Sequence, residues 1–203
     1  ALIAPQALLA DSESTTQALS MSVGGSHLIK IVQAANGADP VNISLSLGGP
    51  SEAGAAITQS ATNVTTRMRM TNFASSSTEK MKITASVDGD NVAWQYSNTR
   101  LAVSLDAPAS ANLPNFVNYG TYANGLQGSK VLAEGIPAAN PDDAPTGGLK
   151  GAQDLVTGIR TAWSGTGVGD GYIIRYDFTI VDQAFTQQPV ANATVTYTLV
   201  ADN

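Results

Sequence analysis

The sequence predicts an all-β fold: a two-sheet antiparallel sandwich, immunoglobulin-like or jelly-roll, with long loops and an extended N-terminal arm. Three observations support this prediction: many short segments alternate apolar and polar residues, turn dipeptides separate them, and no window keeps a 3.6-residue period. The chain has 203 residues, 43% of them apolar, which suffices for the core of one such domain. We therefore expect an apolar arm and linker at residues 1–17 and a single β-sandwich domain at residues 18–203.

Strict alternation identifies the expected strands, because a strand at the surface buries one face and exposes the other. Residues 41–47 give the clearest case, with an aliphatic side chain at every odd position and a polar one at every even position. The same pattern predicts strands at 19–23, 28–32, 66–71, 81–87, 101–105, 172–180 and 193–200, and a shorter strand near 130–133.

Glycine-containing dipeptides mark the expected turns, because glycine readily adopts the positive φ that tight turns require. These dipeptides are Asn36-Gly37, Asp88-Gly89, Asn124-Gly125 and Asp170-Gly171. Residues 107–150 hold five of the nine prolines, which predicts long surface loops of the kind that carry contacts or function. A helical turn is expected only at residues 51–56.

Composition excludes several classes of function. The chain has no cysteine, so it lacks disulfides, thiol catalysis and cysteine-type zinc sites. A net charge of −6 argues against a nucleic-acid partner, since phosphate binding needs clustered positive charge. No run of about 18 apolar residues occurs, so no helix is expected to span a membrane.

The same composition predicts a compartment. Only 13% of the residues are charged, and Ser, Thr, Asn and Gly are abundant, which favours a secreted protein, either extracellular or at the cell surface. One interpretation of the apolar residues 1–10 is a mature N-terminus left by signal peptidase. Another is the tail of a signal region that is cleaved after Ala10.

Candidate catalytic and metal-binding residues are few. His27 is the only histidine, and no Gly-x-Ser-x-Gly elbow accompanies it, so we interpret it as a turn or strand-edge residue. Glu52 and Glu134 have no feature of a glycosidase pair beyond their presence. The glycine-rich residues 165–171 open a strand rather than a helix, and residues 88–91 lack the acidic spacing of a calcium loop. The sequence thus predicts no enzyme, catalytic residue, cofactor or metal site.

Aromatic residues in the long loops allow two interpretations. Phe116, Tyr119 and Tyr122 are candidate ligand contacts that would stack on the sugar rings of host or matrix glycans. The other interpretation, which we prefer, is that they pack against the ends of the sandwich.

The N-terminal arm is the most informative segment. Leu2, Ile3, Leu8 and Leu9 are too apolar to remain in water, and the polar residues 11–17 join them to the domain. Such an arm can fold back on its own sandwich or insert into a neighbouring subunit as an added strand. Insertion would be a heterologous contact, and repeating it generates an open filament.

Several strand-like segments carry a resemblance to a known class: 66–71, 80–86, 152–159, 172–180 and 193–199, together with 19–32 and 41–54. They resemble secreted bacterial single-domain, immunoglobulin-like β-sandwich surface proteins. More loosely, the whole layout is similar to donor-strand subunits of pili and biofilm fibres, in which an apolar N-terminal arm completes the next subunit. The resemblance implies a structural filament subunit whose partners are copies of itself. The alternative expectation is a secreted adhesin or carbohydrate-binding module.

Overall fold

The computed structural model describes most of the chain, including all strands of the two sheets discussed below. The described residues are 26–47, 52–53, 60–73, 78–107, 117–118, 125–136, 138, 143–144, 146–181 and 193–203. The predicted strand at 19–23 and the arm residues Leu2, Ile3, Leu8 and Leu9 lie outside the described residues, as do the loop aromatics Phe116, Tyr119 and Tyr122.

The described part of the chain consists of strands and one short helix. In chain order these are β1 (Ser26–Gln33), β2 (Ser60–Phe73), β3 (Met81–Asp88), α1 (Asn91–Tyr96), β4 (Thr99–Asp106), β5 (Val117–Asn118), β6 (Lys130–Ile136), β7 (Thr146–Leu149), β8 (Gln153–Ile159), β9 (Ala162–Trp163), β10 (Tyr172–Ile180) and β11 (Thr194–Ala201). The all-β prediction is therefore confirmed.

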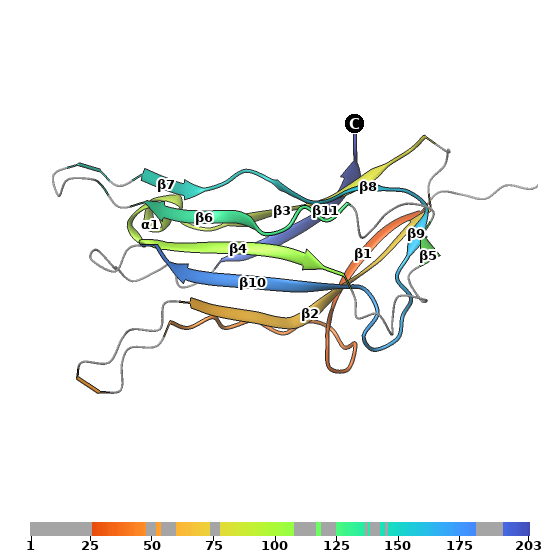
Figure 1. The fold of residues 1–203 in the computed structure, drawn as a ribbon, viewed down its shortest axis with the longest axis horizontal. Helices are drawn as coiled ribbons and strands as arrows, with labels where there is room; N and C mark the ends of the chain where they lie inside the picture. Colours follow the sequence, from red (N-terminus) through yellow and green to blue (C-terminus); the bar gives the residue numbers. More distant parts are fainter. Residues whose placement is uncertain are drawn as a thin grey trace, which may run out of the picture.

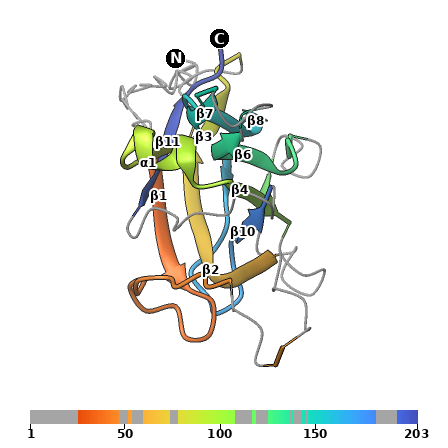
Figure 2. The ribbon, with the colours of Figure 1, turned by 90° about the vertical axis from the view of Figure 1, so that its left-hand side faces the viewer.

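The strands form two antiparallel sheets. The larger sheet has the order β5-β9-β2-β10-β4-β6-β7, and β1 pairs with β2 along its whole length. The smaller sheet has the order β11-β3-β8. Figure 1 shows β2, β10 and β4 side by side, and Figure 2 shows β1 and β11 on the same side of the molecule.

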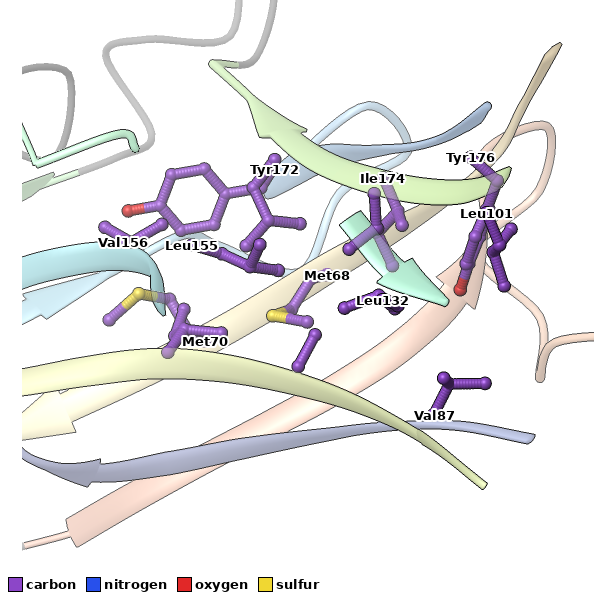
Figure 3. Close-up of a cluster of buried hydrophobic side chains, with 14 of the residues drawn as sticks. Met68, Met70, Val87, Leu101, Leu132, Leu155, Val156, Tyr172, Ile174 and Tyr176 are labelled. Carbon is purple, nitrogen blue, oxygen red and sulfur yellow. The ribbon is translucent and has the colours of Figure 1, made fainter. Parts of the chain in front are cut away.

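Side chains from both sheets fill one core. Met68 and Ile174 of the larger sheet are fully buried, as is Ile83 of the smaller sheet. Trp94 of α1 packs edge-on against Phe178 of β10, with ring centroids 6.4 Å apart. Figure 3 shows core side chains of β2, β10, β8 and β3 gathered in the same interior. The alternation read from the sequence thus places the buried face of these strands correctly.

The prediction of a strand at residues 41–47 is wrong. The segment follows a turn in which the Gln33 amide donates to the Ala38 carbonyl (2.8 Å), and Gly37 there has a φ of +72°. Ile43 and Leu45 pack against the core at half burial, as alternation predicted. However, within the described part of the chain no backbone hydrogen bond joins residues 41–47 to a strand. Among the described residues, its periodicity therefore accompanies side-chain packing and not backbone pairing.

Two structural details were not expected from the sequence. Asp90 caps the six-residue helix α1, because its Oδ1 accepts the amides of Val92 (2.9 Å) and Ala93 (3.1 Å). The four turn glycines also divide into two groups. Gly37 and Gly171 have the positive φ expected of tight turns, whereas Gly89 and Gly125 lie in bends and are not among the positive-φ glycines.

Candidate functional site

His27 belongs to a structural network. Its Nδ1 lies 2.6 Å from Oδ1 of Asn72, and its Nε2 lies 3.4 Å from Oε1 of Glu79. The Asn72 amide is buried and donates to the carbonyls of Ile159 (3.2 Å) and Arg160 (2.8 Å). These contacts tie the start of β1 to β2 and to the end of β8. They present His27 with amide and carboxylate groups rather than with a hydroxyl nucleophile.

The carboxylates considered at the sequence level have structural contacts or lie in solvent. Glu134 accepts a hydrogen bond from Nε of Arg100 at 2.7 Å, and Glu52 is exposed. Asp90 is engaged in capping α1. Among the residues that the structure describes, no group of three or more His, Asp or Glu side chains is placed to hold a metal ion.

A groove lies beside β1 and the start of β11, two strands that Figure 2 shows on the same side of the molecule. We call it the edge groove, and its volume is about 510 Å³. Its described lining consists of Ile31, Pro40, Val41, Asn42, Ile43, Leu45, Thr66, Trp94, Leu101, Tyr176, Phe178, Ala193, Thr194 and Val195. No Asp, Glu, Lys or Arg is among these residues.

The edge groove has an apolar floor and two backbone walls. Trp94, Leu101 and Phe178 belong to the buried core and form the floor. Residues 40–43 and Leu45 supply one wall of the groove, and residues 193–195 at the start of β11 supply the other. The volume lies within the range of about 300–1,000 Å³ that is common for ligand pockets.

In the described part of the chain, the two segments that form the walls of the edge groove have backbone without a strand partner on the groove side. Among the described strands, β11 pairs with β3 alone and β1 pairs with β2 alone. Residues 41–47 pair with neither, as shown above. An extended peptide between the two walls would therefore find backbone donors and acceptors on both sides, which is the basis of strand addition.

A tyrosine pair links the two sheets at the edge groove. The hydroxyl of Tyr197 in β11 donates to the hydroxyl of Tyr176 in β10 at 2.9 Å. Burial raises the pKa of Tyr176, and the hydrogen bond from Tyr197 opposes part of that rise. Burial also raises the pKa of Tyr197. The negative charge of an ionised Tyr176 raises it further, and so does the hydrogen bond that the Tyr197 hydroxyl donates to Tyr176. Both hydroxyls therefore stay neutral over the ordinary pH range.

Comparison with protein-family models, with curated proteins and with solved structures finds no match for this chain. In the described part of the chain, no helix is long and apolar enough to cross a membrane.

The sequence does not reveal the edge groove, because its lining comes from several separate segments of the chain. The one available signal was the alternation of residues 41–47, which marked a strand-like segment beside β1. The predicted donor residues of the arm and the loop aromatics stay predictions, since the described residues do not include them.

Proposed function

We propose that this protein is a structural subunit of an extracellular filament, and that subunits assemble by inserting residues 1–10 of one copy into the edge groove of the next. The observation that supports this most directly is the edge groove, whose described lining is uncharged and includes two segments with backbone unpaired among the described residues. An inserted strand gains main-chain hydrogen bonds from the walls and apolar contacts from the floor.

The arm and the edge groove match in chemistry and length. Residues 1–10 contain no charged residue, and neither does the described lining of the groove. A ten-residue strand spans about 33 Å, enough to run along the eight-residue strand β11. Because arm and groove are different surfaces of the same chain, each insertion leaves a free groove at one end and a free arm at the other.

The proposal also completes the fold. An added strand beside β11 would extend the three-stranded smaller sheet and cover the half-buried residues Ile31, Ile43 and Val195. The sandwich would then be an immunoglobulin-like one whose missing strand comes from a neighbour. Secretion to the cell surface follows from this role.

The test is negative-stain electron microscopy of the full-length protein beside a variant lacking residues 1–10. Two matched substitutions on β11 complete the set. Val195→Glu places a charge in the edge groove, whereas Thr196→Glu places it on the neighbouring, exposed position. Circular dichroism checks that each variant keeps its β structure.

We expect filaments from the full-length protein and from Thr196→Glu, and none from the deletion or from Val195→Glu. Compact monodisperse particles in the full-length sample would contradict the proposal, as would filaments that persist without residues 1–10. A glycan-binding screen would then test the alternative role, with Tyr119→Ala and Tyr122→Ala as the variants expected to lose binding.

A further inference from the structure

We infer that the edge groove recognises one face of the arm, with Ile3, Pro5, Ala7 and Leu9 turned to its floor and Gln6 turned to solvent. This inference rests on the proposed function, since it takes residues 1–10 of a second copy as the occupant. It goes further by stating which side chains the groove selects.

The choice of face follows from strand geometry. Successive side chains of a strand point to opposite faces, so the odd and even residues of the arm lie on different sides. Every odd residue of the arm is apolar, whereas the even face carries the amide of Gln6. Placing Gln6 against apolar floor residues such as Leu101 and Phe178 would bury an amide without a hydrogen bond, which is costly.

Two polar groups lie near the floor, and neither offers Gln6 a partner. Thr66 Oγ1 and Trp94 Nε1 have no hydrogen-bond partner within the described structure. Both atoms, however, are inaccessible to solvent, although their residues line the edge groove. An amide that enters the groove does not reach them, so these groups do not favour the even face.

Pro5 is compatible with this placement. Proline lacks an N–H and is tolerated in a strand where one ladder hydrogen bond can be missing. In a strand, the backbone groups of odd residues point to one lateral neighbour and those of even residues to the other. The even residues of the arm therefore offer one wall a complete set of hydrogen-bonding groups, and Pro5 removes a single donor from the other side.

The test measures binding of a synthetic peptide by fluorescence anisotropy. The receptor is the full-length chain with Leu2, Ile3, Leu8 and Leu9 all replaced by Asp. These changes prevent its own arm from competing with the peptide for the edge groove, whichever face of the arm is used. The peptides are residues 1–10 with the natural sequence, with Leu9→Asp and with Leu8→Asp. The Leu9→Asp and Leu8→Asp peptides carry the same substitution at adjacent positions, and therefore on opposite faces of the strand.

We expect Leu9→Asp to weaken binding by about ten- to a hundredfold, because a buried leucine is replaced by a charge. Leu8→Asp is expected to weaken it by less than about threefold, as for an exposed position. Adding Val195→Glu to the receptor should abolish binding of the natural peptide, whereas Thr196→Glu should not. A larger loss with Leu8→Asp overturns the inference, and so does failure of the natural peptide to bind.

The outcomes separate this inference from the filament proposal. If the natural peptide binds with the expected preference for Leu9 but the full-length protein forms no filaments, the groove selects this face and the arm docks in its own subunit. If filaments form and require residues 1–10 but Leu8→Asp is the more harmful change, the filament proposal stands and the assigned face is wrong.

Discussion

The two lateral sides of the sandwich differ in how their sheet edges are finished. On the side of β8, a short segment covers the edge: Leu126 forms a bridge with Val156, the Gln127 amide donates to the Leu155 carbonyl (2.8 Å), and the Thr157 amide donates to the Gly125 carbonyl (2.9 Å). On the side of β1 and β11, the described residues place no such backbone pairing between the sheets.

Burial follows this difference. Leu132, Leu155 and Val156 on the covered side are fully buried. On the open side, Ile43 is only half-buried and Val41 is 64% exposed. The covered side shows that backbone pairing and side-chain packing together finish an edge. Within the described structure, residues 40–47 supply packing without backbone pairing, and the edge groove lies beside them.

The largest expected change in the free energy of unfolding comes from core side chains on the two sides. Leu155→Ala should lower the free energy of unfolding by about 3 kcal/mol, because a fully buried side chain leaves a cavity. Ile43→Ala should lower it by only about 1 kcal/mol, since its side chain is half-buried and borders an existing groove. Urea denaturation measures both values. Equal losses would show that the two sides are packed alike.

The next effect concerns the backbone contact that covers β8. A Cβ on Gly125 would lie 2.2 Å from the carbonyl oxygen of Thr157, so the backbone must shift. Gly125→Ala should lower the free energy of unfolding by about 1–3 kcal/mol. Gly151→Ala is the matched control, because nothing lies within 4 Å of its Cβ position. A change within about 0.5 kcal/mol is expected there, and a similar loss in both variants would contradict the prediction.

The tyrosine pair at the edge groove gives a smaller effect. Tyr176→Phe should cost about 1 kcal/mol, because Tyr197 loses its buried acceptor. The double variant Tyr176→Phe with Tyr197→Phe should cost less than the sum of the two single changes, since neither hydroxyl is left unpaired. A double-mutant cycle by thermal or urea unfolding measures the coupling.

The same pair makes stability depend on alkaline pH. Both pKa values are raised in the folded protein, mainly by burial, so the unfolded chain loses these protons first. The stabilisation is fully present below the ordinary tyrosine pKa of about 10, and the free energy of unfolding falls as the pH rises above it. Unfolding midpoints measured between pH 9 and pH 11 should fall less steeply in the double Phe variant than in the natural protein.

Much of the fold is predictable because alternation marks strands such as β3 and β10. Alternation alone does not mark β8, since Leu155 and Val156 are adjacent and both buried where the register with β3 shifts. Periodicity indicates where side chains point but not whether the backbone is paired. This is why the alternation of residues 41–47 predicted a strand. The groove depends on how distant segments meet, which no local pattern contains.

The smallest expected effect on stability tests the unpaired backbone of the open side directly. Ser44→Pro removes an amide proton that makes no hydrogen bond within the described structure, from a segment that belongs to no strand. The free energy of unfolding should therefore change by less than about 0.5 kcal/mol. Thr84→Pro is the contrasting variant, because Thr84 lies in the central strand β3 between Thr198 and Asp154.

Proline at position 84 interrupts a strand that is paired on both sides, so Thr84→Pro should be far more destabilising than Ser44→Pro. If the added strand pairs with residues 40–45, Ser44→Pro should also slow filament growth while leaving the subunit folded. Light scattering measures growth, and urea denaturation measures the fold. A destabilisation by Ser44→Pro as large as that by Thr84→Pro would show that the segment is held by backbone hydrogen bonds, and the two sides of the sandwich would then be finished in the same way.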